Sequence, residues 1–346
     1  MNGYINKKSE ILIVGSKEKF TLDNIYYKTL KHLGYKVDFL NIEKSLNNRI
    51  IAKVKIYLIE LNYKILRKKI LSFFKKKKKK YKLIIFFKNI FLDYETICKI
   101  RLMNNKAKYI NIFSDDPLNI DNPIISNENF LKTIPKYDLF CIWSQKLKKK
   151  LKKKFKSRIL YLPFSYDSIA VSKFKITNKK IRDEINFIGT YDQNRLNILN
   201  SIKIKKNIYG GNWWRFVGRS VKNSIVGKHI YGSQIFKLMN ETAISLNILR
   251  KQNLTSHNMK TFEIPAYNGL MLTTRSKEQN KFFKENFACY MYSSKKELNK
   301  KIKFILKNPK KAEKVRMLGN SIAKKYSYIS RIKYLLKEVN RKKDEF

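Results

Sequence analysis

The stretch INFIGTY, residues 185–191, decides the fold of this chain. Its first four residues predict a short strand, Gly189 follows at once, and a helical pattern runs from about residue 192 to residue 202. A strand that passes through a glycine turn into a helix is the repeating unit of an α/β domain. Because this unit begins near the middle of a chain of 346 residues, it indicates that a second domain starts here.

The same alternation continues to the end of the second half. Further strands are expected at residues 207–209, 243–249, 270–273 and 287–291. Helices are expected at residues 233–240, 258–267, 294–306 and 310–326, with a basic helix from about residue 328. Strands that alternate with helices predict a parallel sheet covered on both faces.

The N-terminal half has the same rhythm. Its strands are expected at residues 11–14, 36–40, 83–87, 109–113, 139–143 and 160–164, and its first helix at residues 17–33. A second helical pattern places apolar side chains three and four residues apart, at Ile51, Val54, Leu58, Leu61 and Ile65.

We therefore expect two Rossmann-like α/β domains facing a cleft, with ligands beyond the carboxyl ends of the strands. The expected boundaries are 1–164 for an acceptor-side domain, 165–183 for a linker, 184–327 for a donor domain and 328–346 for a basic C-terminal helix. We expect that last helix to pack back across the first domain.

The charge of the chain is extreme, because 77 Lys and Arg stand against 26 Asp and Glu, for a net charge of +51. One explanation is compositional drift, since the residues that AT-rich codons encode are abundant. The other is an anionic partner: nucleic acid, a membrane surface or an acidic glycan. Two segments favour such a partner: residues 51–74, which lead into the lysine run 75–80, and residues 146–156, with eight lysines in eleven positions.

Nucleic acid is the less expected partner. The aromatic residues fall within strand and helix patterns, and no zinc-finger, helix-turn-helix or RNP-like motif is present. Mean hydropathy is −0.45, with no uncharged run long enough to span a membrane and no signal peptide. We expect a cytoplasmic protein, and peripheral contact with the inner face of the membrane stays open. Because Cys98, Cys141 and Cys289 are far apart, no disulfide framework, metal site or cofactor is expected.

The densest polar segment is residues 247–274. Arg250 and Lys251 come directly after an expected buried strand, and Thr255 or Ser256 is suited to cap the helix that follows. A helix N-terminus beside two cations favours a diphosphate. Glu263, two turns further on, has the carboxylate that would accept hydrogen bonds from two ribose hydroxyls. Taken singly, each of these residues is also typical of an ordinary surface.

Four features together resemble the CgeB-like (spore-maturation) glycosyltransferases, which are similar to the two-domain GT-B enzymes. They are INFIGTY with Arg195, Tyr209 and Gly210 with Trp213, the stretch 247–272, and the motif TFEIPA at 261–266. The resemblance covers about residues 183–335, including the ending YSY at 326–328 with Arg331. The first half resembles their N-terminal domain mainly through SDDP at 114–117.

The resemblance implies a donor site in the second half, with Glu263 on the ribose and Gly189 in a loop that lets the diphosphate approach. The full set of expected donor-binding residues is Gly189, Tyr191, Arg195, Arg250, Lys251, Asn253, His257, Thr261 and Glu263. Thr255 stands where the wider superfamily often has a second glutamate, and Asn268 where the family commonly has glycine. A catalytically inactive sugar-binding homologue therefore stays an alternative.

The acids of the first half follow the expected strand 109–113. Asp115 and Asp116 are suited to act as a general base for an acceptor hydroxyl, to bind a metal, or simply to form an Asp-Pro turn. The candidate catalytic residues are therefore Asp115, Asp116 and His257. We expect a hexosyltransferase-like enzyme that moves a sugar from a nucleotide-sugar donor to an unidentified glycan, lipid-linked or protein acceptor, with a role in cell-surface glycan synthesis. A basic nucleic-acid-binding α/β protein is the alternative from another class.

Overall fold

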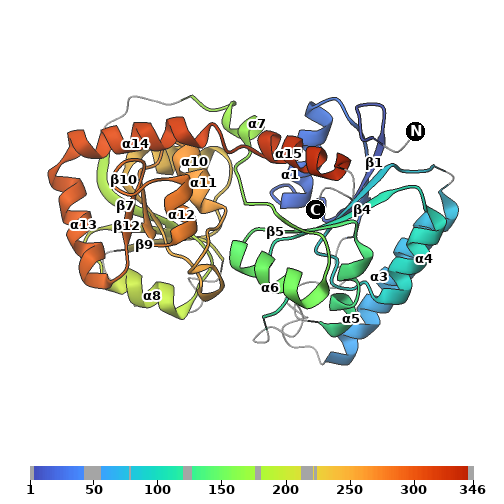
Figure 1. The fold of residues 1–346 in the computed structure, drawn as a ribbon. Helices are drawn as coiled ribbons and strands as arrows, with labels where there is room; N and C mark the ends of the chain where they lie inside the picture. The colour runs from blue at the N-terminus through green and yellow to red at the C-terminus, as the bar shows by residue number, and fades with distance from the viewer. Residues whose placement is uncertain are drawn as a thin grey trace. The chain divides into compact units, whose positions relative to one another are not determined.

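The computed structural model describes residues 4–42, 56–77, 79–119, 127–175, 181–211, 221 and 224–341. Trp213 and the first apolar positions of the 51–74 segment, Ile51 and Val54, lie outside these residues. The chain divides into two compact units (Figure 1). One is Met1–Pro163 together with Arg331–Phe346, and the other is Phe164–Ser330. The segment 165–183, expected to be a linker, is thus part of the second unit.

The first unit is built on a parallel sheet of six strands in the order β2-β1-β3-β4-β5-β6. The strands are β1 (Glu10–Gly15), β2 (Lys36–Asn41), β3 (Leu83–Phe87), β4 (Lys108–Phe113), β5 (Leu139–Ile142) and β6 (Ile159–Tyr161). All five residues of β3 are buried, as expected for a central parallel strand with helices on both sides. The order of the strands reverses between β1 and β3, which places the ligand-binding crevice of such a sheet there.

The second unit has a parallel sheet in the order β12-β11-β10-β7-β8-β9. Its strands are β7 (Arg182–Ile188), β8 (Lys206–Tyr209), β9 (Ser224–Gly227), β10 (Thr242–Asn247), β11 (Met271–Thr274) and β12 (Tyr290–Tyr292). The order reverses between β7 and β10. Each unit is therefore a Rossmann-like α/β domain, as the sequence predicts.

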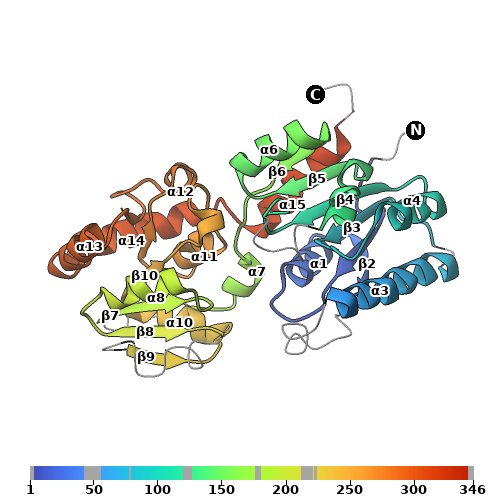
Figure 2. The ribbon, with the colours of Figure 1, turned by 90° about the horizontal axis from the view of Figure 1, so that it is seen from below.

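Helices cover both faces of the first sheet (Figures 1 and 2). α1 and α15 lie on one face, and α3, α4 and α6 lie on the other. The helical segments are α1 (Leu22–His32), α3 (Ile56–Lys76), α4 (Tyr94–Met103), α5 (Glu128–Leu131), the 3-10 helix η1 (Ile134–Lys136), α6 (Gln145–Phe155) and α15 (Tyr328–Asn340). α1 begins later than the predicted residue 17, because the side chain of Thr21 caps it by accepting a hydrogen bond from the Asn24 amide.

α3 presents a different face to the core from the one that the sequence pattern suggested. Its buried side carries Tyr63, Leu66, Ile70 and Phe74. Of the predicted apolar stripe, Leu61 and Ile65 are 44% and 50% exposed. The 3-4 spacing correctly predicted a helix here, but the helix has apolar side chains on two sides, and only packing chose between them.

The second unit has a separate apolar cluster on each face of its sheet. Side chains of α8 and α13 pack with the strands in one cluster, and side chains of α10, α11 and α12 pack in the other. Its helices are α7 (Ser168–Val171), α8 (Gln193–Asn200), α10 (Ser233–Glu241), the 3-10 helix η2 (Lys251–Asn253), α11 (Lys260–Ala266), α12 (Lys277–Phe282), α13 (Lys295–Lys307) and α14 (Pro309–Ala323).

Candidate functional site

Arg195 joins the two loops at the point where the order of the second sheet reverses. It lies on α8, whose first turn is capped by Asp192, and its side chain is buried. Its Nη1 donates to the carbonyl of Thr190, after β7, at 3.0 Å. Its Nε and Nη2 both donate to the carbonyl of Ile248, after β10, at 3.2 and 2.9 Å. Burial, with a contribution from Arg250, lowers the pKa of Arg195 to about 10. The residue expected to bind the donor thus fixes the shape of the loops.

Two glycines let the chain ends of β7 and β8 approach each other. A Cβ on Gly189 would stand 2.9 Å from the Phe187 ring and 3.2 Å from Nη1 of Arg195. Gly210 has φ of +144°, and a Cβ there would stand 2.0 Å from the carbonyl oxygen of Gly189. At these two positions the backbone therefore carries no side chain, which is the condition for the close approach of a diphosphate.

Arg250 and Lys251 are exposed at the end of the strand β10, beside this glycine turn. Nη2 of Arg250 donates to the hydroxyl of Thr190. Asn253 closes η2, and its side-chain oxygen is buried with no hydrogen-bond partner among the described residues. This edge therefore combines two exposed cations with a buried acceptor that has no partner among the described residues.

Tyr191 continues the same loop. It is half-buried, its hydroxyl donates to Oε1 of Gln193 at 2.6 Å, and its amide donates to the carbonyl of Gly211 at 3.3 Å. It therefore lies next to the glycine turn with its hydroxyl held by a neighbour.

His257 lies inside the domain, with no exposed surface. Its Nε2 accepts a hydrogen bond from the amide of Phe164 at 3.2 Å, and its Nδ1 lies 3.2 Å from Oε2 of Glu278. The rings of Phe262 and Phe282 meet it edge to face. With Nε2 as an acceptor, the neutral ring carries its proton on Nδ1 and donates it to Glu278. In this conformation both nitrogens serve the fold rather than a substrate.

The expected helix cap at Thr255 or Ser256 is wrong. α11 begins at Lys260, its N-cap residue is Met259, and no side chain caps it. The hydroxyl of Ser256 instead donates to Oε2 of Glu278 at 2.7 Å. The segment after Arg250 turns through η2 before α11 begins, so the cations at the end of β10 are not the first residues of a long helix.

Glu263 lies in the first turn of α11, with 19% of its side chain exposed. Its Oε2 accepts from Nζ of Lys260, one turn earlier, at 2.6 Å. Thr261, in the same turn, is fully buried, and its hydroxyl donates to Oε1 of Gln279 at 2.7 Å. The two neighbours therefore differ: Glu263 reaches the surface, and Thr261 holds the helix.

The sequence reasoning missed the polar network that holds α11. Oε1 of the fully buried Gln279 accepts from Thr261, from Thr273 on β11 and from Asn247 on β10, and its Nε2 donates to the Thr274 carbonyl. Asn247 also exchanges hydrogen bonds with Asn258. The sequence signal that could have predicted this network is the polar residue at the end of each apolar strand, Asn247 on β10 and Thr273 on β11. Such residues need hydrogen-bond partners once they are buried.

In the first unit, two acids follow β4, the strand next to β3. Asp115, which follows β4, forms an ion pair with Lys88, which follows β3. Asp116 accepts from the amide of Leu118 at 2.9 Å, as in an Asp-Pro turn.

Asp23 on α1 belongs to the same edge and was missed from the sequence. Its Oδ2 accepts from the amide of Ser16 at 2.6 Å, and a Cβ on Gly15 would collide with it at 2.3 Å. Burial raises the pKa of Asp23, although the Ser16 amide and the charge of Lys88 act in the opposite direction. This edge therefore holds a half-buried carboxylate near a partly exposed ion pair.

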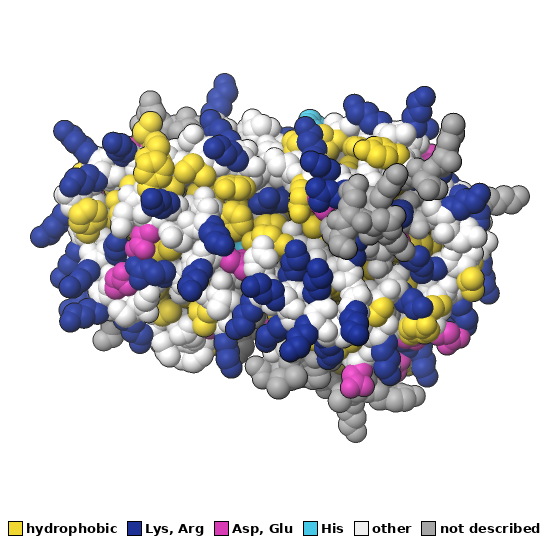
Figure 3. All heavy atoms as spheres, in the orientation of Figure 1, with side chains coloured by type: hydrophobic (Ala, Val, Ile, Leu, Met, Phe, Trp, Pro, Cys, Tyr) yellow, Lys and Arg dark blue, Asp and Glu magenta, His cyan; other side chains and the backbone are white. Residues whose placement is uncertain are grey.

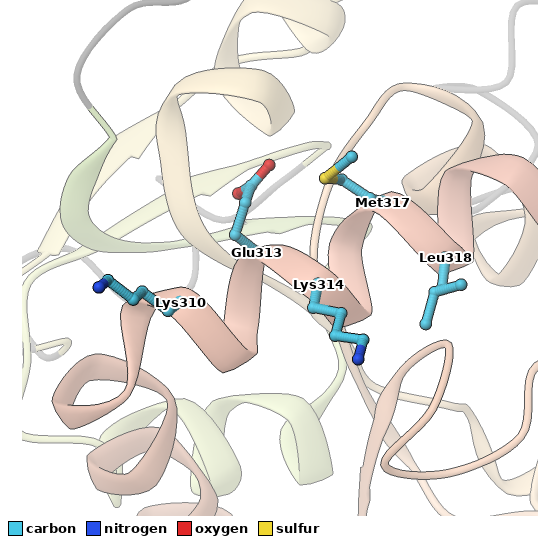
Figure 4. A pocket seen from close by; sticks show the side chains of 5 residues that line it. All are labelled: Lys310, Glu313, Lys314, Met317 and Leu318. Carbon is cyan, nitrogen blue, oxygen red and sulfur yellow. The ribbon is translucent and has the colours of Figure 1, made fainter.

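Three other observations concern metal binding, membrane spanning and surface pockets. Within the described ranges, no three His, Cys, Asp or Glu side chains lie together as a metal would require. No described helix is both long and apolar enough to cross a bilayer. A shallow depression of about 450 Å³ is lined by Lys310, Glu313, Lys314, Met317 and Leu318, all from α14 (Figure 4). It includes none of the expected site residues.

The second half of this chain matches a known protein family by sequence, and the chain as a whole matches solved structures by fold. Residues 194–337 match the family model described as Glycosyl transferase-like. No curated protein is detectably similar in sequence.

Three solved structures illustrate the fold. A glycosyltransferase from Rickettsia africae has 12% identity and a TM-score of 0.63, over 96% of this chain and 99% of its own. Sucrose-phosphate synthase from Thermosynechococcus elongatus has 10% identity and a TM-score of 0.64, over 96% and 99%. Anabaena HepE in complex with UDP-glucose has 10% identity and a TM-score of 0.59, over 95% and 98%. This chain therefore has the GT-B fold of two Rossmann-like domains, and its residues 194–337 match the glycosyl transferase-like family.

Proposed function

We propose that this protein transfers a sugar from a nucleotide-sugar donor to an acceptor, and that the second domain holds the donor. The observation that carries the proposal is the loop pair after β7 and β10, where glycine backbone lies beside Arg250 and Lys251. The match of residues 194–337 supports it, as does the UDP-glucose in the Anabaena HepE structure. The CgeB-like subtype belongs to this proposal and rests on the sequence motifs.

In this proposal each group at the loop pair has one task. Arg250 and Lys251 neutralise the diphosphate, and Gly189 lets it approach the main chain. Glu263 accepts the hydrogen bonds of the ribose hydroxyls. The side-chain oxygen of Asn253, which is buried without a partner among the described residues, would accept a hydrogen bond from the ligand once its side chain turns toward the site.

The remaining expected residues hold these groups in position or border the donor. Arg195 acts as a positioning residue, because its guanidinium holds the carbonyls of both loops. His257 and Thr261 are positioning residues as well, since both are fully buried beneath the site. Tyr191 continues the glycine loop and borders the donor.

The first domain would supply the acceptor side. A carboxylate there would take the proton of the acceptor hydroxyl as its oxygen bonds to the sugar and the nucleoside diphosphate leaves. Asp115 and Asp116 are the candidates from sequence, and Asp23 joins them because it lies at the reversal point of the sheet and burial raises its pKa. The acceptor in this proposal is a glycan, a lipid-linked sugar or a protein, on the inner side of the membrane.

Thermal unfolding in the presence of nucleotides tests the donor site. UDP, GDP and UDP-glucose are compared, and at a concentration of about 100 times the dissociation constant a bound nucleotide adds about 2.7 kcal/mol to the free energy of unfolding. Glu263→Gln should lose most of that gain while it remains folded. Glu128→Gln, which removes an exposed carboxylate on α5, is the matched control and should keep the gain.

Two results would contradict the donor site. One is an equal response of Glu263→Gln and Glu128→Gln to every nucleotide that binds. The other is stabilisation by duplex DNA with no response to any nucleotide, which would favour the nucleic-acid-binding alternative instead.

A further inference from the structure

The helix α6 exposes a continuous arc of lysine. Its sequence is QKLKKKLKKKF, and only Leu147 and Leu151 are buried against the sheet. At about 100° per residue, the remaining positions spread the ammonium groups over an arc of about 200°. The exposed lysines of the helix and its C-cap are Lys146, Lys149, Lys150, Lys152, Lys153, Lys154 and Lys156.

These lysines have no acidic counterpart. Neither the helix nor its caps contains an Asp or a Glu, and among the described residues none of the seven forms an ion pair. Lysines four apart, such as Lys149 and Lys153, repel each other on a helix surface. Lys and Arg side chains cover the surface over α6 in the face shown in Figure 3. The lysines of α6 therefore repel one another, and an anionic partner would relieve that repulsion.

The lysine run after α3 behaves differently, although the sequence gives both runs the same character. Lys77 lies 3.3 Å from Asp38, and Lys79 lies 2.6 Å from Glu10 and 3.1 Å from Asp38. Nζ of Lys80 donates to the carbonyl of Met103 at 2.8 Å. Lys77, Lys79 and Lys80 hold β1, β2 and α4 together, whereas none of the seven lysines of α6 and its C-cap has such a contact among the described residues, so α6 is the lysine run with more charge left for a partner.

We propose that the first domain docks through α6 on a membrane surface of anionic lipid. Lysine alone makes up the arc, with neither an arginine fork to read base edges nor an exposed aromatic ring to stack on bases. Phe155, its one aromatic residue, is half-buried. Flexible ammonium groups on a convex surface suit fluid headgroups, which need only charge. The inference rests on the proposed function in one respect. If the first domain binds the acceptor, docking through α6 brings that domain to an acceptor in the membrane.

Co-sedimentation of the full chain with vesicles tests this inference. The vesicles contain about 30% phosphatidylglycerol in phosphatidylcholine, with pure phosphatidylcholine as the neutral arm. The α6 variant carries Lys149→Gln, Lys150→Gln, Lys153→Gln and Lys154→Gln. The matched variant carries Lys296→Gln, Lys300→Gln, Lys303→Gln and Lys307→Gln on α13, which removes the same charge from exposed positions of the second domain.

We expect the unmodified chain to bind anionic vesicles only, and binding to weaken between low and physiological salt. The α6 variant should lose about tenfold or more in affinity at low salt with an unchanged melting temperature, and the α13 variant should lose about threefold or less. Equal losses in the two variants, or no vesicle binding at low salt, would overturn the proposal. So would α6-dependent binding of duplex DNA without vesicle binding. The nucleotide response is a separate measurement, so donor binding and docking can fail independently.

Discussion

The guanidinium of Arg195 donates two hydrogen bonds to the main-chain carbonyl of Ile248, across 53 residues of sequence. The same side chain holds the carbonyl of Thr190. A single buried residue therefore sets the separation of the two loops where we propose that the donor diphosphate binds.

Arg195→Gln should lower the free energy of unfolding by about 1–3 kcal/mol, because it leaves the buried carbonyl of Ile248 without its two donors. Urea unfolding measures the change. The matched control is Arg182→Gln, which removes an exposed arginine of β7 that lies 3.7 Å from Glu184. That control should cost less than about 1 kcal/mol. An equal loss in both variants would mean that the Ile248 contact does not support the loop.

Gly210→Ala should destabilise the second domain far more than Gly34→Ala destabilises the first. Both glycines have positive φ, +144° and +84°. At Gly34 the nearest atom to an added Cβ is 3.8 Å away, so the cost is the backbone strain alone, about 1–2 kcal/mol. At Gly210 the Cβ would meet the carbonyl of Gly189 at 2.0 Å, so the strand ends must separate. Thermal unfolding of the two variants compares them, and equal shifts in Tm would show that the two strand ends are not in close contact.

Asn268 occupies a left-handed position with φ of +58°. The CgeB-like family, which the sequence resembles, commonly has glycine at this position. Its Nδ2 donates to Oδ1 of Asn240 at 2.9 Å, which offsets part of the strain. Asn268→Ala should therefore cost about 1–2 kcal/mol, while Asn268→Gly removes the strain along with the hydrogen bond and should cost less. Urea unfolding of both variants checks the order, and a more stable alanine variant would contradict the left-handed turn.

Lys79→Gln should weaken the fold in a pH-dependent way. Burial of Asp38 raises its pKa, but hydrogen bonds from Tyr81, Lys79 and Lys77 outweigh burial, and the net pKa lies below the ordinary value. The stabilisation is present above the unfolded pKa of about 3.9 and is lost as pH falls through the lower folded value.

At pH 7 we therefore expect Lys79→Gln to cost up to about 1 kcal/mol, because the pair is partly exposed. The cost should shrink as Asp38 is protonated. Urea unfolding from pH 7 down to pH 3 follows this change. Lys149→Gln on α6 is the control, and its stability should stay within about 0.5 kcal/mol of that of the unmodified chain, by an amount that does not change with pH in this range. Lys79 also pairs with Glu10, so a constant cost of Lys79→Gln at every pH would exclude both carboxylates as its stabilising partners.

The sequence by itself determined the class of fold. The expected strand 83–87 coincides with β3, and the expected strands near residues 109 and 139 lie within one residue of the starts of β4 and β5. Central parallel strands are recognisable because both faces are buried and every residue must be apolar. The expected strand at residues 185–188 matches the more buried end of β7, which begins three residues earlier with the polar residues Arg182, Asp183 and Glu184. Helix boundaries were less certain, since a cap such as Thr21 or Met259 depends on the local turn.

Tertiary structure alone decided what the polar residues do. Arg195, Arg250 and His257 were all expected from the sequence to bind the donor. In the structure, Arg195 holds a carbonyl 53 residues away, His257 is fully buried against Phe164, and Arg250 stays exposed. The two lysine runs also differ in the structure. Asp38 and Glu10 form ion pairs with the run after α3, and no described acid forms an ion pair with the lysines of α6. Apolar periodicity is local and can be read from neighbours in the chain, but the partner of a charge is set by which distant segments the sheet brings together.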